Sequence, residues 1–199
     1  MRDGTVRRYT AASCPPPCDG PAPLYRYHTG QGHRAGDVPW DCQQCGEDVA
    51  RLLTEDLHVG VTVTGRPTHS CQPPLHYRDV FVLSYCCMSD TDGFVVGLRQ
   101  GGLPVTVLQS GRVFFAKASV ATMSRDQVVV ADCDDVCGLE RRVVVWVQGK
   151  RPGGGGQGGD ERWGRLHAMS RCTGQLVCVM PPPESPPDDD DDNDDIVKK

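Results

Sequence analysis

Apolar residues in this chain occur in short runs that glycine and proline interrupt. In residues 57–65 the apolar side chains alternate with small or polar ones, which predicts a half-buried β-strand. Residues 80–87 are almost continuously apolar, which is typical of a strand buried on both faces. Similar runs predict strands at 94–98, 105–108, 112–116, 127–131, 143–147, 163–167 and 175–180.

Turn signals between the runs indicate how the strands pair. Asp90–Gly93 directly precedes the predicted strand at 94–98, and Gln109–Gly111 separates the predicted strands at 105–108 and 112–116; both segments end in glycine. Such connections favour hairpins, in which the joined strands are antiparallel. The sequence therefore predicts a mainly antiparallel sheet.

Two short helices are predicted beside the strands. Asp41 is a suitable N-cap for the first helix, and Val49, Leu52 and Leu53 share one face of it. The second helix starts at Asp132 and continues through Leu139. Together with the strands, these helices predict a single domain of the α+β class with disordered termini.

Composition divides the chain into three segments. Residues 1–37 are rich in cysteine and proline and are predicted to be irregular. Residues 38–180 form the predicted α+β domain, which contains a glycine-rich loop at 152–159. Residues 181–199 combine a polyproline spacer with a run of aspartates, and we expect this acidic tail to be disordered.

Residues 188–199 of this tail account for the whole net charge of −5, so residues 1–187 together are neutral. A neutral body argues against a nucleic-acid partner, since such proteins need a basic surface. No apolar run approaches the length of a membrane span, which is about 18 residues or more, and no signal peptide is apparent. We therefore expect an intracellular protein whose thiols are reduced.

The cysteines contain the best candidate for a site. Cys14 and Cys18 form a C-x3-C pair, and Cys42 and Cys45 form a C-x2-C pair. Two such pairs supply the four thiolates of a structural zinc site with little loss of chain entropy. His28 and His33 lie between the pairs and could replace one thiolate. The alternative is that these cysteines are small apolar residues without a metal.

Other groupings give weaker signals for chemistry. His69, Cys71 and His76 suggest a nucleophile pair, but closeness in sequence does not place catalytic residues together. The aspartates at 132–135 lack the glycine and glutamate spacing of a calcium loop. The glycine-rich loop lacks the lysine and hydroxyl residue of a phosphate loop. We therefore expect a protein that is not an enzyme and has no small-molecule substrate.

Residues 92–145 resemble the repeated module of betaherpesvirus tegument and early regulatory proteins from the short unique genome region. That module is related to the SUKH superfamily of toxin-immunity proteins. The resemblance lies in a strand with glycine, a Gly-x-Val-aromatic run and an Ala-Asp pair that precedes a helix. The matching positions are Gly97, Gly111, Val113, Phe114, Ala131 and Asp132.

The resemblance implies a SUKH-like fold and a role without catalysis. Proteins of that family counter antiviral defence or modulate gene expression by binding host proteins. By this resemblance, the partner is a host protein, and the location is the host cytoplasm, the nucleus or the virion tegument. The loop at 66–77 and the Gln109–Gly111 turn are candidate contact surfaces, because loops on a rigid sheet usually carry recognition.

A second resemblance offers an alternative. Val38-Pro39-Trp40-Asp41, followed by Leu53 and His58-Val59, is similar to the adenovirus early 34-kilodalton adaptors of a cellular ubiquitin ligase. Those adaptors are also rich in cysteine and histidine and are thought to hold zinc. This resemblance implies a zinc-binding adaptor in place of a SUKH-like regulatory protein.

Overall fold

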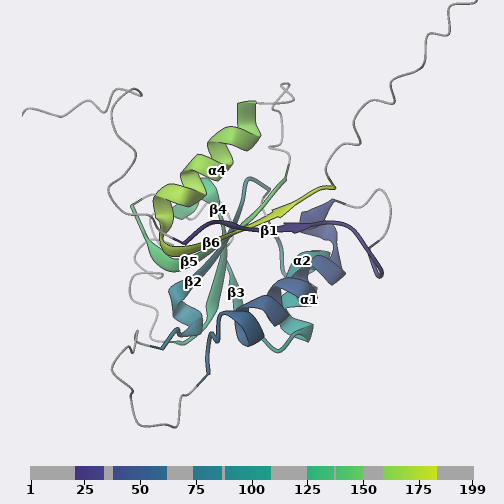
Figure 1. Ribbon diagram of the computed structural model, residues 1–199, viewed down its shortest axis with the longest axis horizontal. Coiled ribbons are helices and arrows are strands. Elements are labelled where there is room, and N and C mark those ends of the chain that lie inside the picture. Colours follow the sequence, from purple (N-terminus) through teal and green to yellow (C-terminus); the bar gives the residue numbers. More distant parts are fainter. Residues whose placement is uncertain are drawn as a thin grey trace, which may run out of the picture.

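One β-sheet organises the protein (Figure 1). The computed structural model describes residues 21–33, 38–61, 74–86, 88–108, 125–136, 138–149 and 159–182, with side chains from Gly164 onward in the last segment. Within these segments the strands are β1 Leu24–Tyr27, β2 Val80–Ser84, β3 Val105–Val107, β4 Val128–Asp132, β5 Arg141–Val147 and β6 Cys172–Met180. Their order in the sheet is β1-β6-β5-β2-β4-β3, and every neighbouring pair is parallel.

The predicted α+β fold with a mainly antiparallel sheet is therefore wrong, and the fold is α/β. Residues 94–98, predicted as a strand, belong to helix α2, Gly93–Gln100. Residues 163–167 belong to helix α4, Gly159–Arg171. Each helix is the crossover that parallel strands need, where the sequence pattern suggested a hairpin. The class differs because the connections are helices.

The helical period of α2 is visible in its burial. Phe94, Val95 and Leu98 are fully buried, whereas Arg99 and Gln100 are exposed. This spacing places the apolar residues on one stripe of a helix. The Phe-Val-Val run has high β-propensity, but packing of this stripe against the sheet and α1 overrides it.

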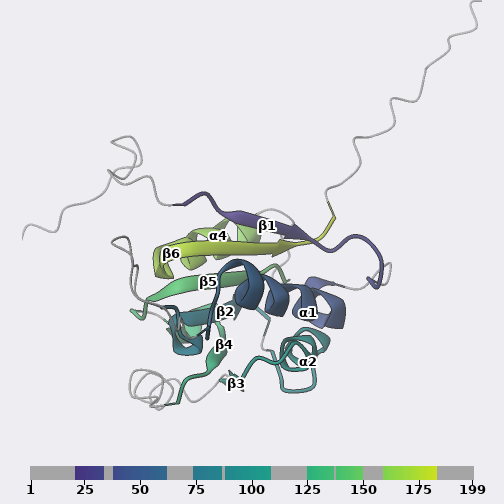
Figure 2. The ribbon, with the colours of Figure 1, turned by 60° about the horizontal axis from the view of Figure 1, so that its bottom comes forward.

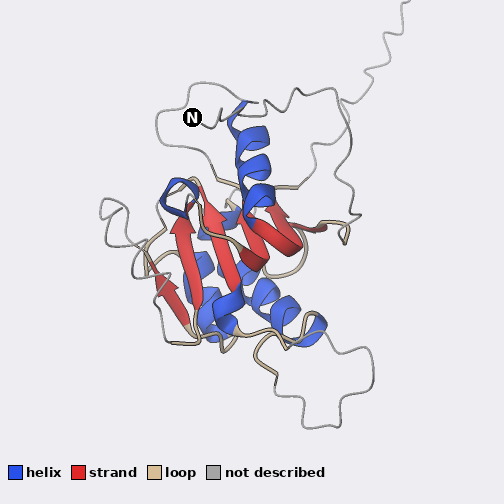
Figure 3. Ribbon diagram, turned by 90° about the vertical axis from the view of Figure 1, so that its left-hand side faces the viewer, coloured by secondary structure: helices blue, strands red, loops and turns tan. Residues whose placement is uncertain are grey.

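Helices cover both faces of the sheet. Helix α1, Gln43–Arg51, and α2 lie in front of the sheet in Figure 2, and α4 lies behind it. Figure 3 shows the same three layers from the side, with the strands in red between the helices. Side chains of β2 alternate between two apolar clusters: Val82 packs under α1 and α2, and Phe81 packs on the opposite face. Burial on both faces explains the continuous apolar run of this strand.

Helix α1 was partly predicted. Val49, Leu52 and Leu53 are buried together, as expected for one helical face. The helix continues beyond Arg51 as a wider π-type turn, Leu52–Asp56. Its N-cap is Cys42, not Asp41, which lies in the preceding short turn Pro39–Asp41.

The predicted strand at 57–65 is not seen in its described part. Leu57 follows the π-type turn, His58 has a positive φ of 54°, and residues 59–61 form a turn. Residues 62–65 lie outside the described segments, as do the predicted strand 112–116 and most of the glycine-rich loop. Residues 24–27, within the segment predicted to be irregular, form β1 and pair with β6.

Glycines allow α1 and α2 to touch through their backbones. A Cβ atom at Gly97 would overlap the Gln43 carbonyl oxygen, and one at Gly46 would overlap the Phe94 carbonyl oxygen. Gly93 makes an equally close approach to the Asp41 carbonyl oxygen. The N-terminal end of α1 is therefore fixed directly on α2.

In the part of the chain that the structure describes, no helix has the length and apolar character to cross a membrane.

Candidate metal centre

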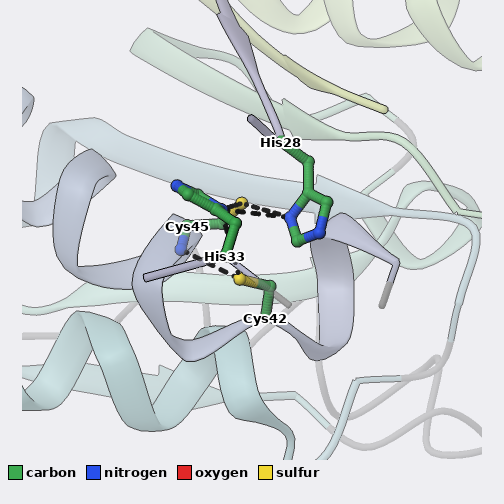
Figure 4. A group of neighbouring side chains, drawn as sticks. All are labelled: His28, His33, Cys42 and Cys45. Atoms are coloured by element: carbon green, nitrogen blue, oxygen red, sulfur yellow. Dashed lines mark hydrogen bonds between the residues drawn. The ribbon is translucent and has the colours of Figure 1, made fainter. Parts of the chain in front are cut away.

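Four potential metal ligands converge beside the N-terminus of α1. They are His28, His33, Cys42 and Cys45, and each directs a side-chain nitrogen or sulfur toward the others (Figure 4). All four ligand atoms lie within 4.8 Å of one another. Within the described segments, this is the group that could hold a metal ion.

The C-x2-C spacing places both sulfurs on the first turn of α1. Cys42 is the N-cap and has an extended backbone, with φ of −96° and ψ of 114°. Its sulfur accepts a hydrogen bond from the Cys45 backbone N–H at 3.4 Å. An N-cap side chain normally satisfies this amide, so the local helix start itself orients the first cysteine.

The two histidines arrive from the end of β1. His28 follows the strand directly, and its backbone N–H donates to the Met180 carbonyl at 2.7 Å, which extends the pairing with β6. A tight turn then returns the chain to His33. Gly30 and Gly32 have φ of 105° and 91°, values that glycine adopts without strain. This turn directs His33 back onto the two cysteines.

The spacing of the donor atoms matches a tetrahedral zinc ion. The usual Zn–N and Zn–S bond lengths place two nitrogens about 3.3 Å apart, and a nitrogen about 3.5 Å from a sulfur. In the protein, the Nδ1 atoms of His28 and His33 are 3.2 Å apart. His28 Nδ1 lies 3.3 Å from Cys45 Sγ, and His33 Nδ1 lies 3.5 Å from each of the two sulfurs. Four of the six donor–donor distances thus agree with tetrahedral coordination of one zinc ion, and the other two are no longer than 4.8 Å.

Asp48 supports the second histidine from outside the group. Its Oδ2 lies 3.3 Å from His33 Nε2, and its Oδ1 accepts a hydrogen bond from Gln44 Nε2 at 3.0 Å. When His33 carries its proton on Nε2, this N–H donates a hydrogen bond to the Asp48 carboxylate. Nδ1 of His33 is then unprotonated, and its lone pair points at the sulfurs. Metal-binding histidines commonly have such a carboxylate partner, which fixes their tautomer.

The group is enclosed by protein. Cys42 and Cys45 are each 3% exposed, and His28 is 6% exposed. Burial raises the pKa of the Cys45 thiol, and the neighbouring Cys42 and Asp48 raise it further. Without a cation, this sulfur therefore keeps its proton. A divalent cation reverses this preference, because a thiol that coordinates a metal is deprotonated.

The structure brings together two of the four cysteines of the predicted zinc site. Cys42 and Cys45 occupy the site, whereas Cys14 and Cys18 lie outside the described residues. His28 and His33, expected to replace one thiolate at most, both contribute. The signal for them in the sequence was their position between the cysteine pairs.

Three of the six positions of the viral family motif lie within the described residues, and they belong to two different elements. Gly97 is buried in α2, and Ala131 and Asp132 end β4, where the Asp132 carboxylate accepts a hydrogen bond from the Asp134 backbone N–H. Gly111, Val113 and Phe114 lie outside the described residues, as do His69 and Cys71. The resemblance to the betaherpesvirus proteins therefore stays a prediction.

Comparisons with known proteins give little guidance. No protein-family model matches the sequence, and no curated protein is similar to it. Among solved structures, the C-terminal domain of a possible DNA helicase from Lactobacillus plantarum WCFS1 has 18% identity and a TM-score of 0.43. The alignment covers 76% of this chain and 78% of that domain. A similarity at this level assigns neither a fold family nor a function.

Proposed function

We propose that this protein is a zinc-stabilised binding module that recognises a host protein without catalysing a reaction. A single Zn²⁺ would be held by His28, His33, Cys42 and Cys45. The agreement between the donor distances and tetrahedral zinc geometry carries this proposal. The proposal follows the zinc-adaptor alternative and replaces two of the four predicted cysteines by histidines.

The donor set favours zinc over other common ions. Two thiolates and two imidazoles suit Zn²⁺, whereas Mg²⁺ and Ca²⁺ prefer oxygen ligands. Four protein donors complete a tetrahedron and leave no position for water or substrate. Closed sites of this kind are structural, and catalytic zinc sites keep an open position.

The ion would join two parts of the fold that have few other links. Strand β1 is four residues long, lies at the edge of the sheet and pairs with β6 alone. The metal would connect the end of β1, at His28, to the start of α1, at Cys42 and Cys45. The 29–33 turn lies between these two elements in the sequence. Zinc binding should therefore stabilise the folded state and order the edge of the sheet.

The binding role is supported by exposed tyrosines on β1, the strand that leads into the metal group. Tyr25 and Tyr27 on β1 are 41% and 46% exposed. Tyr25 pairs with Cys178 and Tyr27 pairs with Met180, and both of these β6 residues face α4. Both tyrosine rings therefore lie on one face of the edge strand. Tyrosine is enriched in protein interfaces because it combines a large apolar area with a polar end. The host partner and the viral origin come from the sequence resemblances.

Metal analysis tests the zinc proposal directly. Protein purified without added metal should contain one zinc per chain, and Cys42→Ser combined with Cys45→Ser should lose it. Cys14→Ser combined with Cys18→Ser is the matched control and should retain one equivalent. Loss of zinc in that control would show that the predicted four-cysteine site is correct.

Cobalt substitution gives an independent measure of the donor set. The intensity of the sulfur-to-cobalt charge-transfer band scales with the number of thiolates, so two are expected. Affinity capture from host-cell extract then tests the binding role, with Tyr25→Ser and Tyr27→Ser as the surface variant. Capture of the same proteins by both forms would exclude this surface as the binding site.

A further inference from the structure

The two cysteines of the metal group are also arranged for a second reaction. Cys42 and Cys45 lie at the N-cap and third position of one helix, and the Cys45 N–H already points at the Cys42 sulfur. Both sulfurs belong to a group whose ligand atoms lie within 4.8 Å. A disulfide needs the sulfurs at about 2.05 Å and the Cα atoms about 4.4–6.8 Å apart, a span that adjacent positions of a helical turn provide.

We propose that Cys42 and Cys45 form an oxidation site, at which a hydroperoxide converts the pair to a disulfide and expels the metal ion. This inference rests on the proposed zinc site. The metal holds both sulfurs as thiolates next to each other, which is the reactive form of cysteine. The same donors therefore serve as a structural site when reduced and as a disulfide when oxidised.

The reaction balances with hydrogen peroxide as the two-electron oxidant. One thiolate attacks a peroxide oxygen, which breaks the O–O bond, forms a sulfenic acid and releases hydroxide. The second thiolate attacks the sulfenic sulfur, forms the S–S bond and displaces a second hydroxide. Two protons convert the hydroxides to water. The sulfurs lose two electrons, the peroxide gains them, and zinc leaves as Zn²⁺ because two imidazoles alone bind it weakly.

The fold allows the pair to close without unwinding α1. Cys42 has an extended backbone outside the regular helix, so its side chain can rotate toward Cys45 while the helical hydrogen bonds persist. Oxidant would reach the sulfurs by displacement of the turn that carries His33, since residues 29–32 of this turn are exposed. Access should therefore limit the rate of oxidation more than the chemistry does.

Three other described cysteines, Cys133, Cys172 and Cys178, are poor competitors. Cys172 and Cys178 lie on the opposite side of the sheet from the metal group, where burial raises the pKa of both thiols, to about 11 for Cys178. A thiol with a raised pKa has little of the reactive thiolate at neutral pH. Cys133 is fully buried in the same cluster. The metal-bound pair should thus be oxidised before these three cysteines.

Loss of the metal would have a structural result. The disulfide stays within one turn of α1, so it places no constraint on β1 or on the 29–33 turn. The connection between the edge strand and the helix would be broken, and the tyrosine surface on β1 would become mobile. Oxidation would in this way control the surface that the proposed function uses.

The test uses the full chain loaded with one equivalent of zinc, confirmed by elemental analysis before oxidant is added. Hydrogen peroxide is then titrated while a zinc-binding chromophore reports released metal. We expect one zinc released per peroxide consumed, and peptide mapping by mass spectrometry should find a Cys42–Cys45 disulfide. Dithiothreitol and zinc should restore the starting form. Cys172→Ser combined with Cys178→Ser should behave in the same way as the original protein.

Failure of this inference differs from failure of the zinc proposal. Protein that never holds zinc refutes the proposed function before oxidation begins. A zinc-loaded protein that keeps its metal while other cysteines oxidise refutes the oxidation site alone. Metal release with a disulfide to Cys14 or Cys18 would also refute it, since the pairing would then lie outside α1.

Discussion

Replacement of Gly97 by alanine should weaken both the fold and the metal site. The added Cβ would lie 2.9 Å from the Glu47 backbone nitrogen and would overlap the Gln43 carbonyl oxygen. Packed helices bring carbon and backbone oxygen no closer than about 3.3 Å. The Gln43 carbonyl oxygen is the closest obstacle, so helix α1 must move away by about 1 Å. Because the obstacle is backbone, rotation of a side chain cannot relieve it.

The energetic result follows from two opposing effects. A gap of about 1 Å forfeits about half of each dispersion contact across the helix pair. Overpacking of this kind costs about 3 kcal/mol at the upper end of its usual range. Alanine returns about 1 kcal/mol through its higher helix propensity. The net loss should be about 2 kcal/mol in the free energy of unfolding. Gln43 lies between Cys42 and Cys45, so the same displacement should lower zinc affinity.

Urea denaturation and zinc competition titration measure the two effects. Gly102→Ala is the control, because its Cβ would have no neighbour within 4 Å and only the φ of 87° is unfavourable. It should cost about 1 kcal/mol and leave zinc affinity unchanged. If Gly97→Ala were no less stable than this control and bound zinc normally, the direct backbone contact between α1 and α2 would be refuted.

Three further predictions address the outer support, the pH response and the core. Asp48→Ala should weaken zinc affinity by about 10–100-fold in competition titrations, whereas Glu55→Ala should not change it. Burial and the neighbouring Arg171 lower the pKa of His167, so stability should fall as pH drops below about 6.5. His167→Gln should reduce that fall when urea midpoints at pH 5.5 and 7.5 are compared in the zinc-free double serine variant. Phe81→Ala removes a fully buried ring and should cost about 3–5 kcal/mol in urea denaturation; a loss below 1 kcal/mol would contradict its place in the core.

The strands buried on both faces could be predicted from local pattern, but the edge strand β1, the helices at 94–98 and 163–167 and the sheet type could not. The apolar runs at 80–87 and 143–147 correspond to β2 and β5, because burial on both faces leaves a clear signal in sequence. The turn residues before Gly93 belong to a loop that precedes a helix, and not to the predicted hairpin. Ser89 donates two hydrogen bonds to the Asp92 carboxylate, from its N–H and its hydroxyl, each at 2.8 Å. This local loop leads into α2, whereas the same residue types also suit a hairpin.

The metal site combines one local signal with one long-range arrangement. Cys42 and Cys45 could be recognised from spacing alone, since both lie within one helical turn. His28 reaches them because Tyr27 of β1 pairs with Met180 of β6, a register between opposite ends of the chain that no spacing rule contains. The cysteine pair can form as soon as α1 forms, but the histidines arrive only when β6 has joined the sheet. Full zinc affinity should therefore require the complete sheet, and a chain truncated before β6 should bind zinc weakly through the two cysteines.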